Sequence, residues 1–338
     1  MDLPTIWFLL LGVLIIGYAV LDGFDLGVGV LYLFARGEEE RRIYLNAIGP
    51  VWDGNEVWLL TGGGALFAAF PVVYATVFSA FYLAMMLVVV ALIARAVSFE
   101  FRGKLEGPGW KKLWDWCFGL GSLLAAVLYG VAVGNVVGGI PIDAGGTFTG
   151  SFLGLLNPLA LLCGLMSLAM FTMQGAAYMC LKSEGELQER MRGWTMRGWL
   201  AFAALYSVVT VVAILTAPHA FEGVLADPLF WILLGLFAAA AASVPLNSRS
   251  GRDGRTFLAS SVTIAALIGL AAVGMFPRVV ASTIDLANSL TIYNSASTPR
   301  TQTAMLIIAL IGMPIVLAYT AYVYKVFKGK VVFDEASY

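Results

Sequence analysis

Long apolar segments separated by short charged stretches dominate the sequence. Nine of these segments approach or exceed the ~20 residues that an α-helix needs to cross a bilayer. They cover approximately residues 5–34, 51–70, 72–97, 116–137, 152–181, 196–217, 229–244, 257–276 and 301–327. The pattern predicts an all-α, polytopic membrane protein with nine transmembrane helices.

Composition agrees with this pattern. Of the 338 residues, 60% are hydrophobic and only 12% are charged, whereas soluble domains carry about 25% charged residues. The 20 basic and 21 acidic residues nearly balance, so the chain lacks the positive excess that a nucleic-acid-binding protein needs. These values indicate an integral membrane protein that binds no nucleic acid.

The distribution of Lys and Arg predicts the orientation. Of the 20 basic residues, 18 fall in alternate loops and in the C-terminal tail, and only Arg278 and Arg300 fall on the other side. Since positively charged loops stay in the cytoplasm, the N-terminus is expected outside and the C-terminus inside, as an odd number of spans requires. We expect one integral membrane domain over residues 1–338, comprising spans one to four, spans five to eight and a peripheral ninth helix. The outer connection over residues 277–300 is expected to fold against the outer surface.

Small residues recur at four-residue spacing within two predicted spans. Gly23 and Gly27 lie in the first span, and Gly130, Gly134 and Gly138 lie in the fourth. Such spacing places small residues on one helix face, where it allows two helix backbones to approach closely. We expect these glycines to serve helix packing.

Four carboxylates within the predicted spans are the candidates for chemistry. Asp22 and Asp25 lie three residues apart in the first span, and Asp53 and Glu56 have the same spacing at the start of the second. Ionisable groups inside a bilayer are costly unless they are paired or hydrated, so each is a functional candidate. The predicted topology places all four in the cytoplasmic half, where crowded carboxyl groups can exchange protons near neutral pH. Asp25 and Asp53 are the first candidates for proton transfer, and Asp22 and Glu56 the second.

Structural roles for these acids are the alternative. Arg95, near the inner end of the third span, is placed by topology to pair with one of them in a buried ion pair. Asp53 could equally cap the second span by accepting backbone N–H bonds.

Histidine and cysteine content argues against a metal site in this chain. His219 is the one histidine, and it is expected to be a solvated loop residue. The three cysteines, Cys117, Cys163 and Cys180, lie in apolar segments without C-x-x-C spacing, and we expect them to be small buried side chains. Haems held by two imidazoles, and most zinc sites, need more ligands than this. The sequence therefore predicts that the chain binds no metal or haem of its own.

Several motifs carry a resemblance to a known family. They are Leu21-Asp22-Gly23-Phe24-Asp25-Leu26-Gly27, Trp52-Asp53-Gly54-Asn55-Glu56-Val57-Trp58, Gly63-Gly64-Ala65-Leu66-Phe67-Ala68-Ala69-Phe70-Pro71, Trp114-Asp115-Trp116, Leu155-Leu156-Asn157-Pro158, Gln174-Gly175-Ala176, Met275-Phe276-Pro277 and Ser289-Leu290-Thr291. Together they resemble subunit II of the cytochrome bd-type quinol oxidases, a family that includes a cyanide-insensitive branch. The resemblance covers essentially the whole chain.

The resemblance implies a division of labour within a complex in the bacterial or archaeal cytoplasmic membrane. Two b-type haems, one haem d and the quinol site would belong to a partner subunit I, with which this chain forms a pseudo-symmetric heterodimer. Quinol oxidation would reduce O₂ to water with protons from the cytoplasm, and turnover would generate a membrane potential. Small accessory subunits, membrane lipid and a structural quinone in this subunit occur among relatives.

The family pattern also bears on the candidate acids. It implicates Asp53 and Asp25 in proton delivery, whereas relatives often have Gln at the position of Glu56. Two other functions are compatible with the residues alone. A proton-coupled secondary transporter also uses buried carboxylates among glycine-broken helices, although near the midplane of the membrane. A purely structural partner of a haem subunit would pair the acids with Arg95.

Overall fold

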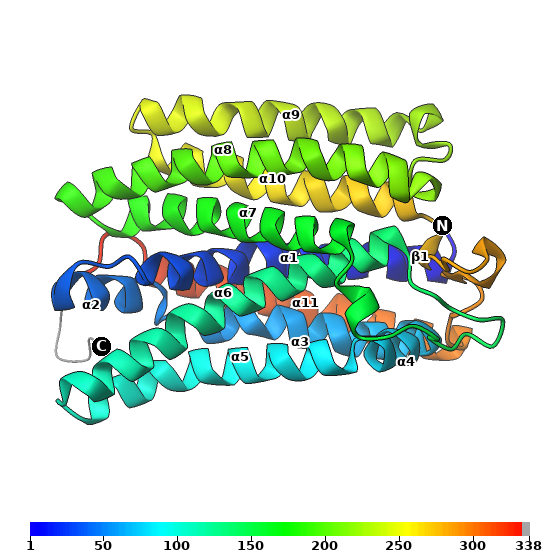
Figure 1. The fold of residues 1–338 in the computed structure, drawn as a ribbon, viewed down its shortest axis with the longest axis horizontal. Helices are drawn as coiled ribbons and strands as arrows, with labels where there is room; N and C mark the ends of the chain where they lie inside the picture. Colours follow the sequence, from blue (N-terminus) through cyan, green and yellow to red (C-terminus); the bar gives the residue numbers. More distant parts are fainter. Residues whose placement is uncertain (333–338) are drawn as a thin grey trace.

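The computed structural model describes residues 1–332 as a bundle of long helices that lie nearly parallel to one axis (Figure 1). The last six residues of the predicted domain lie outside this range. The α-helices are α1 (Leu3–Tyr32), α2 (Gly37–Ile48), α3 (Trp52–Ala69), α4 (Pro71–Ala80), α5 (Tyr82–Phe101), α6 (Pro108–Gly138), α7 (Pro158–Lys182), α8 (Gly185–Thr216), α9 (Pro228–Arg249), α10 (Asp253–Met275) and α11 (Pro299–Val326). Two short strands, β1 (Arg278–Val280) and β2 (Leu290–Thr291), form an antiparallel pair. The all-α fold class is confirmed.

Eight of the helices among the described residues are long and apolar enough to cross a membrane. The helix α3 is not one of them, because Asp53, Asn55 and Glu56 make its first turns polar. At 1.5 Å per residue its 18 residues extend about 27 Å, close to the thickness of the hydrocarbon core. Nine crossings therefore stay a prediction.

The predicted single helix over residues 72–97 is wrong. The chain forms α4 and α5 there, and Phe81 between them leaves the helical conformation with φ −93° and ψ 16°. The Phe81 side chain is buried in an apolar cluster that also contains Phe70 and Val73. This buried aromatic residue holds the break in place.

The helix α1 lies at the centre of the bundle and packs against α3, α6, α7, α10 and α11 (Figure 1). Its approach to α7 depends on glycine, since a Cβ atom on Gly27 would lie 1.8 Å from the carbonyl oxygen of Phe171. A Cβ atom on Gly134 would lie 2.8 Å from the Cα of Ala160, so α6 also approaches α7 closely at a glycine. The predicted packing role of these glycines is confirmed.

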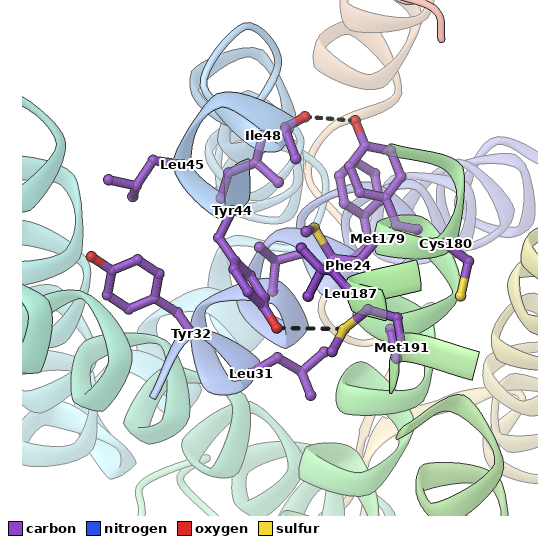
Figure 2. Close-up of a cluster of buried hydrophobic side chains, with 14 of the residues drawn as sticks. Phe24, Leu31, Tyr32, Tyr44, Leu45, Ile48, Met179, Cys180, Leu187 and Met191 are labelled. Atoms are coloured by element: carbon purple, nitrogen blue, oxygen red, sulfur yellow. Dashed lines mark hydrogen bonds between the residues drawn. The ribbon is translucent and has the colours of Figure 1, made fainter. Parts of the chain in front are cut away.

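The helix α2 is an element that the span pattern does not predict. It is too short and too polar to cross a membrane, and its first turn contains three glutamates. Its Tyr44, Leu45 and Ile48 side chains are buried against residues of α1, α7 and α8. Figure 2 shows Tyr44 directed at Met191, with 3.5 Å between its hydroxyl and the sulfur. The helix α2 therefore covers one end of the bundle, here named the α2 end.

The segment over residues 277–300 covers the opposite end. Its two strands pair with each other, Ile140 after α6 donates to the carbonyl of Ala281, and Ser297 donates to the carbonyl of Ala69 at the end of α3. This segment is folded onto the bundle, as expected. The helix α11 then returns to the α2 end, where Val331 donates to the carbonyl of Lys182. The division into two groups of four spans and a ninth helix stays a prediction.

Candidate functional site

Four charged side chains from three helices meet inside the bundle. Asp22 and Asp25 come from α1, Glu56 from α3 and Arg95 from α5, and we name these four residues the acid cluster. Asp22, Asp25 and Arg95 are completely buried. Arg95 Nη2 lies 3.2 Å from Asp22 Oδ1, and Arg95 Nη1 lies 2.5 Å from Glu56 Oε1. The alternative that Arg95 forms a buried ion pair with the candidate acids is confirmed for Asp22 and Glu56.

Asp25 is held differently. Its Oδ2 accepts a hydrogen bond from Asn55 Nδ2 at 2.7 Å, and its Oδ1 has no hydrogen-bond partner among the described residues. Asn55 in turn accepts a bond from the Tyr324 hydroxyl at 3.0 Å. Asp25 is therefore a buried carboxyl group that is oriented by an amide and forms no ion pair with a described residue.

Asp53 lies apart from these acids, on the exposed face of α3. The N-cap of α3 is Val51, and no side chain caps the helix, so the capping alternative for Asp53 is wrong. Glu56 lies about one helical turn further along α3, with 22% of its side chain exposed. The carboxylates thus run from the surface at Asp53, through Glu56, to the buried Asp22.

The acid cluster lies toward the α2 end. Asp25 is seven residues from the end of α1 at Tyr32, about 10 Å along the axis, and Glu56 is in the second turn of α3. The predicted topology places all four acids in the cytoplasmic half of the membrane, and the structure brings Asp22, Asp25 and Glu56 together toward the α2 end.

Two residues of the site are missing from the sequence-based candidates. Asn55 lies between Asp53 and Glu56 in the same motif, so an amide among intramembrane acids was a usable signal. Tyr324 is 269 residues from Asn55 in the chain and joins it only through the packing of α11 against α3. No local pattern marks such a contact.

A second group of charges lies at the α2 end itself. Asp115 on α6 accepts hydrogen bonds from Tyr32, Arg41 and Arg102. Glu38 on α2 accepts bonds from Arg102 and Lys111. We name these six residues the ion-pair layer. The bonds from the Arg102 guanidinium lower the pKa of Glu38 from its ordinary value of 4.5 to about 2.

The histidine and the cysteines lie elsewhere. His219 lies in a loop turn as expected, but it is half-buried and not fully solvated, with its Nε2 3.1 Å from the carbonyl oxygen of Val137. Packing against the end of α6 explains the difference. Cys163 and Cys180 are buried as expected, and Cys117 is half-buried. Among residues 1–332, no group of three His, Cys, Asp or Glu side chains is arranged to hold a metal ion.

Sequence comparison identifies relatives over nearly the full length of the chain. A Haemophilus influenzae protein named probable cytochrome oxidase subunit 2 is 40% identical over 97% of this chain and 95% of its own length. Cytochrome bd-I ubiquinol oxidase subunit 2 of Escherichia coli K12 is 37% identical over 98% of this chain and 96% of its own. Cytochrome bd ubiquinol oxidase subunit 2 of Bacillus subtilis is 36% identical over 99% and 98%.

The fold is similar to that of a solved oxidase chain. A chain of the bd oxidase from Geobacillus thermodenitrificans superposes with a TM-score of 0.81 at 17% identity, covering 97% of this chain and 99% of that chain. The relatives and the apolar helices make this a multi-pass protein of the cytoplasmic membrane. Residues 3–327 match the sequence profile of cytochrome bd terminal oxidase subunit II, and the chain belongs to that family.

Proposed function

We propose that this chain is the haem-free subunit II of a quinol:O₂ oxidoreductase and that it supplies a proton path from the cytoplasm. Its relatives are named as subunits of ubiquinol oxidases, and membership of their family implies a subunit I partner. The same membership favours an oxidase subunit over the secondary transporter. Small accessory subunits and a structural quinone stay predictions.

The observation that carries the proton path is the state of Asp25. A buried carboxylate without a cation is costly, so such a group is stable when it holds a proton or when it exchanges one with a neighbour. Asp25 has one oxygen fixed by Asn55 and one oxygen without a described partner. That free oxygen is available to receive and release a proton.

The carboxylates define a direction for the path. Asp53 is exposed on α3 and would take up a proton, Glu56 would pass it inward, and Asp22 and Asp25 would hold it inside the bundle. The positive charge of Arg95 offsets part of the free-energy cost of burying the negative charges of Asp22 and Glu56. Its ion pairs also support a structural role for these two acids, so Asp25 and Asp53 remain the stronger candidates for proton transfer.

The haem-free assignment is supported by the environment of His219. Its Nε2 lies at hydrogen-bond distance from the Val137 carbonyl, and a haem iron would have to displace that contact. We therefore assign the two b-type haems and the haem d to subunit I, where they would accept electrons from quinol and reduce O₂. The part of this chain is to support that subunit and to move protons.

The proposed orientation has nine crossings, with the N-terminus outside. Counting α3 as a crossing, and α4 with α5 as one, gives an odd number. The start of α1 and the end of α11 accordingly lie at opposite ends of the bundle (Figure 1). Of the 18 basic residues counted on the cytoplasmic side, Arg95 is buried in the acid cluster, and the other 17 then face the cytoplasm.

The test is Asp25→Asn in the intact complex, purified through a tag on this chain. Asparagine keeps the shape and the contact with Asn55 but cannot carry a proton, so we expect O₂ reduction per haem to fall about tenfold or more. Haem b and haem d absorbance should not change. Unchanged turnover with intact haem would overturn the proton path.

Asp227→Asn is the matched control. Asp227 caps α9 at the opposite end of the bundle, and Asn is an equally good N-cap residue. The same chemical change there should leave turnover unaltered. Purification of the chain without any haem-bearing partner would overturn the oxidase assignment itself.

A further inference from the structure

Two tyrosines lie directly beyond the acid cluster. Tyr18 on α1 is four residues before Asp22, which places both side chains on one face of the helix. Tyr129 on α6 packs edge-on against Tyr18, with ring centroids 5.3 Å apart and an interplanar angle of 84°. Tyr18 lies about 6 Å further than Asp22 from the α2 end, at the middle of α1. The tyrosine pair is therefore the next polar feature toward the centre of the membrane.

Buried polar atoms without partners concentrate here. Ten buried side-chain nitrogen or oxygen atoms in the described part of the chain have no hydrogen-bond partner. Five of these ten belong to the acid cluster and the tyrosine pair: the hydroxyls of Tyr18 and Tyr129, Asp22 Oδ2, Asp25 Oδ1 and Arg95 Nε. Buried polar atoms in proteins are almost always satisfied by protein or by ordered water. Because the five atoms belong to one region, a single bound ligand explains their missing hydrogen bonds better than five unrelated unsatisfied groups would.

These side chains are neighbours in the bundle. Tyr18 and Asp22 lie one helical turn apart, the rings of Tyr18 and Tyr129 pack together, and Arg95 lies 3.2 Å from Asp22. Apolar side chains enclose Tyr18, among them Leu14, Trp58 and Met313. A small cluster of donors and acceptors inside an apolar wall is the environment in which proteins hold internal water, which makes about three hydrogen bonds.

We propose that the Tyr18 and Tyr129 hydroxyls, with Asp22 Oδ2 and Arg95 Nε, bind internal water that continues the proton route toward the middle of the membrane. The water site stands on the unpaired atoms alone, and its role in proton transfer rests on the proposed function. A hydroxyl group both donates and accepts. When a proton from water bonds to the tyrosine oxygen on one side, the hydroxyl proton leaves to water on the other side, and neutral tyrosine is restored.

The water site is tested by electron cryomicroscopy of the complex at a resolution that shows ordered water. We expect density at hydrogen-bond distance from the Tyr18 hydroxyl and from Asp22 Oδ2, and loss of that density in Tyr18→Phe. Direct hydrogen bonds between the tyrosines and Asp22, with no water between them, would overturn the site. If Tyr18→Phe does not assemble, Tyr129→Phe serves instead, because it keeps the ring contact and removes only the hydroxyl.

The proton role is tested by time-resolved proton uptake after an O₂ pulse, using a pH-indicator dye. We expect Tyr18→Phe and Tyr129→Phe to slow proton uptake about tenfold, with a larger solvent deuterium isotope effect and unchanged haem content. Tyr206→Phe is the control, since Tyr206 is a half-buried tyrosine of α8 that packs on Phe202 and Phe237.

Asp25→Asn, measured in parallel, separates the two proposals. Slow uptake in Asp25→Asn with wild-type rates in both tyrosine variants would overturn the role of the tyrosine pair and leave the proposed function standing. Wild-type rates in all three variants would overturn both.

Discussion

The acid cluster and the ion-pair layer both combine Asp and Glu with Arg, but they differ in how they balance charge. In the ion-pair layer, both oxygens of Asp115 and both oxygens of Glu38 accept bonds from described side chains. In the acid cluster, the single guanidinium of Arg95 pairs with Asp22 and Glu56, and Asp25 has no ion pair with a described residue. An oxygen of Asp22 and one of Asp25 have no described partner. The first arrangement suits a permanent structural tie, and the second suits groups that gain and lose protons.

The two regions also differ in their access to water. Half of the Glu38 side chain is exposed, whereas Asp22 and Arg95 are completely enclosed. Water screens charge at the surface, and a charge imbalance costs far more in the interior. The same substitution should therefore have a larger effect in the acid cluster than in the ion-pair layer.

The largest expected effect is that of Arg95→Leu. It leaves the buried Asp22 and Glu56 without their cation, and breaking a buried pair in this way costs about 3–5 kcal/mol. We expect the complex to accumulate poorly and the surviving fraction to have a lower Tm. The measurements are the yield of haem-containing complex and its thermal unfolding.

Arg36→Leu is the control for that substitution. Arg36 pairs with Glu186 at the surface, where the side chains are 68% and 85% exposed. An exposed pair of this kind contributes about 1 kcal/mol or less. Equal destabilisation by the two variants would show that burial does not distinguish these ion pairs.

Asp115→Ala is expected to have the next largest effect, on stability and not on turnover. It removes the acceptor that joins α1, α2 and the segment after α5 to α6, and it leaves Arg41 without that partner. We expect a loss of about 3 kcal/mol, seen as a lower Tm, with O₂ reduction per haem retained. Asp25→Asn should show the reverse pattern. Slow turnover in Asp115→Ala with normal haem content would contradict the view that the ion-pair layer is structural and that only the acid cluster exchanges protons.

The sequence predicts the membrane helices well because each bilayer crossing leaves a long apolar segment. It also predicts that Arg95 can pair with one of the candidate acids, because charge inside a membrane is costly unless it is paired, and the structure shows such pairs with Asp22 and Glu56. The break at Phe81 and the helix α2 are not predicted. Both depend on how buried side chains such as Phe81 and Tyr44 pack against distant helices.

For the candidate site, too, the sequence predicts some features and leaves others to the packing of distant helices. Motif spacing indicates which acids are candidates, but it does not show that Asp53 is exposed while Asp25 is buried. Nor does it place Tyr324 beside Asn55 or Tyr129 beside Tyr18, since those contacts join different helices. The arrangement of these side chains inside the bundle therefore becomes visible only in three dimensions.

The smallest expected effect is that of Glu38→Gln, and it depends on pH. The pKa of Glu38 is lowered from 4.5 to about 2 by Arg102, so the ionised form stabilises the fold at pH values well above 4.5. That contribution decreases as the pH falls below 4.5 and is lost near pH 2. Because Glu38 is half exposed, we expect it to be worth about 1 kcal/mol or less.

The measurement is the difference in Tm between wild type and Glu38→Gln at neutral pH and at about pH 4. The difference should narrow at the lower pH, because the wild-type carboxylate is losing its advantage while the amide does not titrate. Glu39→Gln controls for charge in the first turn of α2, since Glu39 is exposed and has no ion pair among the described residues. A Tm difference that stays constant with pH would mean that Glu38 stabilises α2 by packing, and that the ion-pair layer is held by Asp115 alone.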